Sequence, residues 1–123
     1  MTKIAFPTDD GETISQHFGK AQFYSVAALQ EDGNLQYEQR LKWHHGLQES
    51  EPHTHYHSHE SMFEPIADCQ VLVVGGMGQP AYQAALEQGL QVILTGEKNI
   101  TTALAAFRAG SLQSDQRRVH THL

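Results

Sequence analysis

Histidine is the residue whose number and spacing most clearly indicate chemistry in this sequence. The chain holds nine histidines, and six of them lie between His44 and His59. Neutral imidazole is a good ligand for Zn, Ni, Cu and Fe, so clustered imidazoles favour a transition-metal site. The predicted metal ligands are His44, His45, His53, His55, His57 and His59.

The spacing of these histidines supports metal binding in either of two backbone conformations. In an extended chain the alternating residues from His53 to His59 lie on one face. In a helix, His53 and His57 become an i,i+4 pair that can chelate one ion. The segment 43–59 has no apolar periodicity, and a loop of this length in a compact domain is usually functional or disordered. The alternative is a solvated polar loop whose imidazoles bind nothing.

The stretch QVLVVGGMGQPAY combines a strand, a glycine loop and the start of a helix. The apolar run Val71–Val74 is typical of a strand buried on both faces. Gly75, Gly76 and Gly78 permit a positive φ or the close approach of a ligand, and Pro80 suits a first helical turn. Such a turn offers backbone N–H groups and a positive helix end to an anion. The alternative is a tight turn without a ligand.

The same loop formally fits a dinucleotide-binding pattern. Residues 76–81 match G-x-G-x-x-A, and Glu97 lies about 20 residues further on, where a ribose-binding acid would stand. A nucleotide-dependent enzyme is therefore an alternative function. The chain is too short for two mononucleotide-binding halves, and no lysine follows the glycines, which excludes a Walker-type phosphate loop.

Three further positions carry groups that take part in chemistry elsewhere. His17 is either a structural loop histidine or a ligand. Asp9 and Asp10 are either turn formers or paired carboxylates for a metal. Cys69 is the only cysteine, so one chain has neither an internal disulfide nor a multi-thiolate cluster. It is either a small buried hydrophobe or part of a Cys–His pair.

Composition limits the classes of function. The 123 residues form one domain, and the net charge of −6 argues against a nucleic-acid partner. No apolar run approaches the roughly 20 residues of a membrane span, so we expect no membrane partner. The N-terminus lacks a signal-peptide pattern, and we expect a cytoplasmic protein.

Apolar patterns and turn residues predict the elements that position these groups. The predicted strands are Lys3–Thr8, Gln22–Leu29, Leu35–Leu41, Val71–Val74 and Gln91–Leu94. The predicted helices are Ser61–Asp68, Gln79–Gln88 and a last helix between its cap Asn99 and its stop Gly110. The sheet is mixed, and ligands bind at the C-terminal ends of its parallel strands. That edge carries 8–19, 75–79 and 95–97, while 111–123 is expected to be a loose polar tail.

Several motifs in order resemble one family. KIAFPTDDG, SQHFG, the histidine-rich loop, ADCQVLVVGGMG and QVILTGE together look like the dinitrogenase iron–molybdenum cofactor biosynthesis family of NifX-like domains. The resemblance implies a single domain over 1–110 with a ribonuclease-H-like three-layer α/β/α fold and a mixed five-stranded sheet. It also implies binding or carrying of an iron–sulfur or iron–molybdenum cluster precursor without catalytic turnover. A cofactor donor or acceptor protein would be its partner, and the chain itself a monomer or weak homodimer.

Metal or metallocofactor binding is therefore the first hypothesis for the function. The cofactor is a transition metal ion (Zn, Ni, Fe or Cu) or a cluster of the iron–sulfur or iron–molybdenum type. The predicted cofactor-binding residues are Thr8, Asp9, His17, Phe18, Gly19, Gly75, Gly76, Met77 and Gly78. Besides the nucleotide-dependent enzyme, an interaction module whose histidines sense pH stays open, because imidazole titrates near physiological pH.

Overall fold

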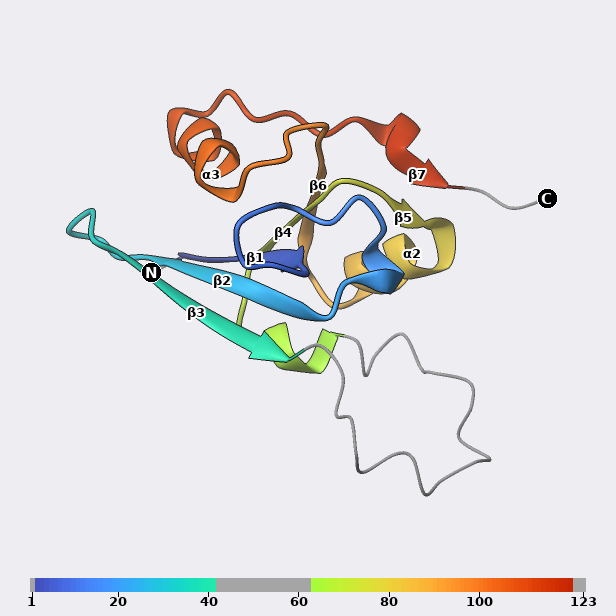
Figure 1. Ribbon diagram of the computed structural model, residues 1–123, viewed down its shortest axis with the longest axis horizontal. Helices are drawn as coiled ribbons and strands as arrows, with labels where there is room; N and C mark the ends of the chain where they lie inside the picture. Colours follow the sequence, from blue (N-terminus) through green and yellow to red (C-terminus); the bar gives the residue numbers. More distant parts are fainter. Residues whose placement is uncertain (1, 42–62, 121–123) are drawn as a thin grey trace, which may run out of the picture.

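The main sheet contains five strands. The computed structural model describes residues 2–41 and 63–120. The strands are β1 (Thr2–Thr8), β2 (Phe23–Leu29), β3 (Leu35–Leu41), β4 (Val71–Val74) and β6 (Gln91–Leu94). Their order is β3-β2-β1-β4-β6, as Figure 1 shows. β2 is antiparallel to β1 and β3, whereas β4 is parallel to β1 and β6, which confirms the predicted mixed sheet.

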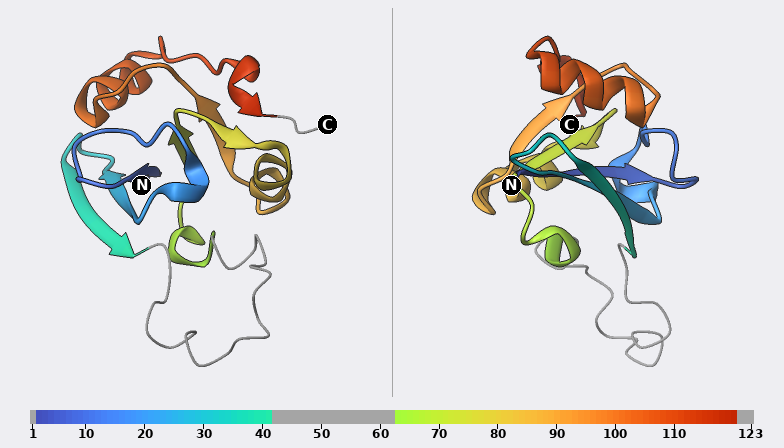
Figure 2. Two further views of the ribbon diagram at one scale, coloured as in Figure 1. Left: turned by 45° about the vertical axis from the view of Figure 1, so that its right-hand side comes forward. Right: turned by 90° about the vertical axis from the view of Figure 1, so that its left-hand side faces the viewer.

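Helices cover both faces of this sheet (Figure 2). The helices are α2 (Gln79–Glu87) and α3 (Ile100–Ala109), with 3-10 turns η1 (Phe18–Lys20), η3 (Glu64–Ile66) and η4 (Gln116–Arg118). Leu72 packs in the core on the α2 side, whereas its neighbours Val71 and Val73 pack on the α3 side. The whole of β4 is therefore buried, as its continuous apolar run predicted. Helix and sheet together give an α/β fold.

The ends of the helices follow local chemistry. The side chain of Asn99 accepts a hydrogen bond from the backbone N–H of Thr102 at 3.0 Å, which caps α3. Gly110 ends α3 with a φ of 78°, and Gly89 follows α2 with a φ of 86°. Both values lie in the left-handed region that glycine adopts without steric cost. The predicted cap Asn99 and the predicted stop Gly110 are confirmed.

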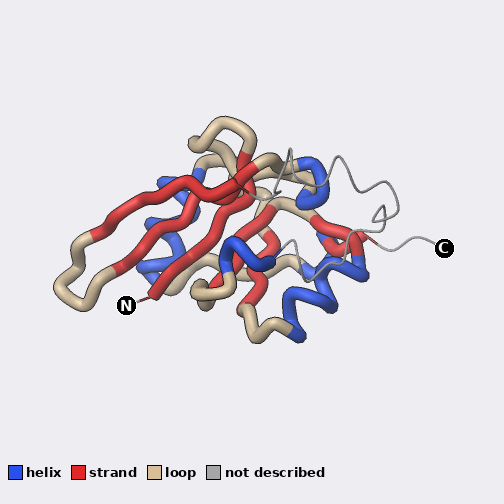
Figure 3. The backbone as a smooth tube through the Cα atoms, turned by 90° about the horizontal axis from the view of Figure 1, so that it is seen from below, coloured by secondary structure: helices blue, strands red, loops and turns tan. Residues whose placement is uncertain are grey.

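One edge of the sheet collects the C-terminal ends of four strands. β1, β4 and β6 are parallel, and β3 runs in the same direction because it is antiparallel to β2. Phe23 pairs with Thr8 on one side and with Leu41 on the other, so β1 and β3 end level with each other. Figure 3 shows the β2–β3 turn at the opposite end, near the N-terminus. We call the edge at which β1, β3, β4 and β6 end the carboxyl edge.

The prediction of a loose tail after α3 was wrong for the part that the structure describes. Residues 116–118 form η4, and β7 (Val119–His120) pairs in parallel with β5 (Met77–Gly78). The backbone N–H of Asp115 donates to the carbonyl of Leu94 at 2.8 Å. The segment thus contacts the C-terminal end of β6 and reaches the glycine loop. Within residues 2–41 and 63–120, no helix is long and apolar enough to cross a membrane.

Candidate functional site

The turn after β1 uses its aspartates to hold its own backbone. Asp10 Oδ1 accepts hydrogen bonds from the backbone N–H groups of Glu12 and Thr13, each at 2.8 Å. These donors stabilise the carboxylate and lower the pKa of Asp10 to about 2. The turn-forming interpretation of Asp10 is therefore the one that the geometry supports.

Thr8 and Asp9, two predicted cofactor-binding residues, belong to the same turn. Thr8 is fully buried, and its Oγ1 accepts from the backbone N–H of Gly11 at 2.9 Å. Asp9 is exposed at the carboxyl edge, and its Oδ1 accepts from the backbone N–H of Gln22 at 3.1 Å. Thr8 is thus part of the turn, while Asp9 presents its carboxyl group at the surface.

The glycine loop and the SQHFG motif contact each other directly. The backbone N–H of Gly75 donates to the carbonyl of Ser15 at 2.9 Å, and that of Phe18 donates to the carbonyl of Gly76 at 3.0 Å. Two motifs separated by about sixty residues in the sequence are therefore joined at the carboxyl edge. The sequence predicted that both lie at this edge, and the structure adds the hydrogen bonds between them.

The predicted cofactor-binding residues divide into buried and exposed groups. Phe18 and Met77 are each 1% exposed and belong to the core on the α2 side. His17 and Gly19 are exposed, and the Ser15 hydroxyl donates to the carbonyl of His17 at 2.9 Å. The exposed residues His17 and Gly19 can contact a ligand at this edge. Phe18 and Met77 pack in the core and hold the neighbouring loops in place.

The glycines of the loop do not adopt the positive φ that the sequence allowed. Gly78 has a φ of −72° and is the N-cap of α2, and Gly75 is likewise outside the positive region. A Cβ at Gly75 would lie 2.6 Å from Cδ of Gln16, so a side chain there would displace the Gln16 amide. A Cβ at Gly78 would meet only Cδ of Pro80, at 3.8 Å. Gly75 therefore makes room for a side chain of the protein itself.

The C-terminal segment adds a residue that the motifs did not indicate. Nη1 of Arg118 donates to the carbonyl of Gly75 at 3.3 Å. The same guanidinium lies against Gly96, where a Cβ would be 3.2 Å from Cζ. Arg118 thus spans the ends of β4 and β6. The adjacent arginines in an otherwise polar segment were the available sequence signal.

The six predicted metal-ligating histidines, from His44 to His59, lie outside the described residues. Both flanks of that segment are described, and both lie at the carboxyl edge. β3 ends at Leu41 beside Phe23, and Phe63 stacks on Phe18 with ring centroids 5.4 Å apart. In residues 2–41 and 63–120 no three His, Cys, Asp or Glu side chains are grouped to hold a metal ion.

Cys69 lies away from this edge. It comes just before β4, at the strand's N-terminal end, and is 8% exposed in the core on the α2 side. Burial is the main cause that raises the pKa of its thiol to about 11. A protonated, buried thiol behaves as a small hydrophobe, which supports the first of the two interpretations.

Glu97 follows the end of β6 and uses its carboxylate within its own turn. Its Oε2 accepts from the backbone N–H groups of Lys98 at 3.0 Å and Asn99 at 3.2 Å. The geometry therefore does not favour the dinucleotide alternative.

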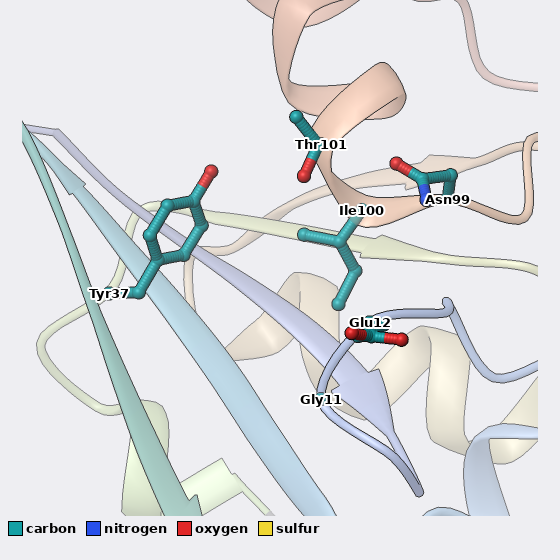
Figure 4. Close-up of a pocket in the computed structure, with 6 residues that line it drawn as sticks. All are labelled: Gly11, Glu12, Tyr37, Asn99, Ile100 and Thr101. Atoms are coloured by element: carbon teal, nitrogen blue, oxygen red, sulfur yellow. The ribbon is translucent and has the colours of Figure 1, made fainter.

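A pocket of about 350 Å³ lies on the α3 side of the turn after β1 (Figure 4). Its lining residues are Gly11, Glu12, Tyr37, Asn99, Ile100 and Thr101. The carbonyl of Glu12 accepts from the backbone N–H of Ile100 at 3.0 Å, which joins the turn to α3. The pocket was not predicted from the sequence, because β3 supplies Tyr37 from a distant part of the chain.

Comparison with solved structures places the fold among known proteins. The protein PH0822 superposes with a TM-score of 0.69 at 19% identity, over 93% of this chain and 96% of that one. The apo form of the orange protein from Desulfovibrio gigas gives 0.66 at 18%, over 94% and 93%. A DUF35-family protein from Thermotoga gives 0.65 at 17%, over 93% of each chain. At these identities the likeness shows the fold alone.

Comparison with families agrees with the resemblance found in the motifs. No match was found among curated proteins. The family described as "Dinitrogenase iron-molybdenum cofactor" matches residues 1–110. This range includes the turn after β1, the SQHFG motif, the glycine loop and α3. Because the match covers most of the chain, the protein belongs to the dinitrogenase iron–molybdenum cofactor family.

Proposed function

We propose that the protein binds an anionic metal–sulfur cofactor precursor, of the iron–molybdenum or iron–sulfur type, and carries it to an acceptor protein without turnover. Family membership relates the chain to the binding or biosynthesis of the iron–molybdenum cofactor. One observation carries the proposal: the Phe18 N–H binds the Gly76 carbonyl while the Phe18 ring stacks on Phe63. The SQHFG motif, the glycine loop and Phe63, which follows the histidine-rich segment, therefore meet at the carboxyl edge.

The donors available at this edge suit an anion better than a cluster ligated by thiolates. Cys69 is buried before β4, at the other end of that strand. The start of α2 supplies backbone N–H groups and the positive end of a helix dipole, which favour negative charge. His17 is exposed beside the loop, and the residues from His44 to His59 would add imidazoles. We propose that this combination holds the cargo.

Binding of a bare transition metal ion by the histidine-rich segment is the second candidate. Such binding needs only imidazoles and no glycine loop. A side chain at position 78 should therefore affect binding of the cofactor precursor but not binding of a bare metal ion. The backbone at Gly78 tolerates a side chain, because its φ is −72° and the nearest atom to an added Cβ is 3.8 Å away. Gly78→Val therefore fills the loop surface without requiring backbone strain.

The test compares wild type, Gly78→Val and the control Ala105→Val, which places the same valine side chain on the exposed face of α3. Tetrathiomolybdate serves as the metal–sulfur anion and is titrated anaerobically by equilibrium dialysis, with Zn²⁺ in parallel. Circular dichroism first establishes that each variant is folded. We expect Gly78→Val to lose the anion and keep Zn²⁺, while Ala105→Val keeps both. No anion binding by wild type, or equal binding by Gly78→Val, would contradict the cofactor-carrier proposal.

A further inference from the structure

Arg118 lies at the carboxyl edge, but it belongs to the segment beyond the residues that the family comparison matches. That match ends at residue 110. The pairing of β7 with β5 brings Arg118 to the glycine loop, where its Nη1 donates to the Gly75 carbonyl at 3.3 Å. Its Nη2 would be 2.5 Å from a Cβ at Gly96. The guanidinium therefore uses space that Gly96 leaves open after β6, and it bonds to the Gly75 carbonyl at the end of β4.

The charge of Arg118 is only partly neutralised. The nearest carboxylate, Asp115, is shared with Arg117, whose Nε and Nη2 lie 3.0 and 3.1 Å from its two oxygens. Arg118 Nε is 3.8 Å from Asp115, which is an ion-pair distance but too long for a hydrogen bond. Within the described residues, this Nε is buried without a hydrogen-bond partner. Two guanidinium groups thus share one carboxylate in a chain of net charge −6.

We propose that Arg118 is an anion-binding residue of the glycine-loop site and supplies the positive charge that an anionic metal–sulfur cofactor needs there. The inference rests on the proposed function. The side chain is 37% exposed, so it can contact a ligand while its guanidinium stays anchored on the Gly75 carbonyl. The exposed part of an arginine side chain offers a charge-assisted hydrogen bond to an anion, which is stronger than a neutral one.

The direct test replaces Arg118 by Met and uses Arg117→Met as the matched control. Arg117 carries the same charge one residue away, but its side chain is 91% exposed. Tetrathiomolybdate is titrated anaerobically against the full chain by equilibrium dialysis, and thermal unfolding is followed for every variant. We expect Arg118→Met to raise the Kd about ten- to a hundredfold, as for the loss of a hydrogen bond to a charged group. Arg117→Met stays within about threefold of wild type, as expected for an exposed charge.

Two more variants keep the proposal falsifiable if Arg118→Met does not fold. Arg118→Lys keeps the charge and restores most of the binding. Gly96→Ala displaces the guanidinium without changing any charge, and we expect it to weaken binding.

Equal weakening by Arg117→Met and Arg118→Met would show a general charge effect and overturn the inference. Wild-type affinity in Arg118→Met or in Gly96→Ala would overturn it while leaving the proposed function standing. If wild type itself does not bind the anion, the proposed function fails and the inference fails with it.

Discussion

The ring of Phe18 stacks on the ring of Phe63, with centroids 5.4 Å apart and an angle of 18° between their planes. Phe18 belongs to the SQHFG motif, and Phe63 is the first described residue after the histidine-rich segment. Both side chains are 1% exposed. The stack therefore fixes Phe63 beside the SQHFG motif, which bonds to the glycine loop.

Truncation of this stack is expected to destabilise the fold strongly. Phe63→Ala removes a fully buried ring and leaves a cavity, so the free energy of unfolding should fall by about 3–5 kcal/mol. The control Tyr37→Ala removes a ring that is 50% exposed and should cost less than about 1 kcal/mol. Urea denaturation followed by circular dichroism measures both losses. Equal losses would mean that Phe63 does not contribute to the core.

Asp68 should stabilise the fold in a pH-dependent way. It accepts from Arg40 Nη1 at 2.6 Å and from Lys3 Nζ at 2.7 Å. The hydrogen bonds from Arg40, and then from Lys3, hold the pKa of Asp68 well below its usual range. A depressed pKa gives stability that is present above the unfolded value of about 3.9 and is lost as the pH falls through the folded value.

Asp68→Asn should therefore lower the free energy of unfolding at neutral pH, by about 1 kcal/mol because the carboxylate is half-exposed and screened. The gap to wild type should stay constant above about pH 5 and shrink below about pH 4. Urea denaturation over a pH series measures it. Glu87→Gln, on an exposed position of α2, is the control and should show no gap. A gap that persists undiminished in strong acid would contradict the ion-pair explanation.

The contact between Gly75 and Gln16 can be tested by a double-mutant cycle. Gly75→Ala should displace the Gln16 amide, which otherwise donates from Nε2 to the Ile14 carbonyl at 3.2 Å. We expect a loss of about 1 kcal/mol, the net contribution of one hydrogen bond. In a Gln16→Ala background the same change should cost less, because the clash is gone. Gly78→Ala should be nearly neutral, and additive losses at Gly75 and Gln16 would contradict the close approach.

The histidine-rich segment should bind Ni²⁺, Zn²⁺ or Cu²⁺, and more weakly as the pH falls through about 6.5, because protonated imidazole cannot ligate. The test variant changes His53, His55, His57 and His59 to Ala. The control is His17→Ala, which removes one exposed imidazole outside the segment. Isothermal titration at several pH values compares them with wild type. If the fourfold variant binds as tightly as wild type, the segment is not the metal site.

The sequence by itself determined the five strands of the main sheet and the helices α2 and α3, whereas the predicted helix Ser61–Asp68 is a 3-10 turn over Glu64–Ile66 in the described residues. Val71–Val74 is a continuous apolar run, and such a run is stable only as a strand with both faces covered. Asn99 and Gly110 mark the ends of α3 because a cap depends on one side chain or one backbone angle. The predicted strand Leu35–Leu41 has the same bounds in the structure. These features are local, so a short window of residues contains the information.

Only the tertiary structure decided which side chains of the protein contact the glycine loop. Arg118 contacts Gly75 across 43 residues, and this contact leaves no periodic pattern in either segment. The glycines suggested unusual backbone angles or a bound ligand, but at Gly75 the reason is the space taken by the Gln16 side chain. Polar contacts between distant segments depend on where the packed sheet places its strand ends. For this reason a glycine pattern alone does not tell which of its glycines another segment packs against, and the folded chain shows Gln16 against Gly75 and room for a Cβ at Gly78.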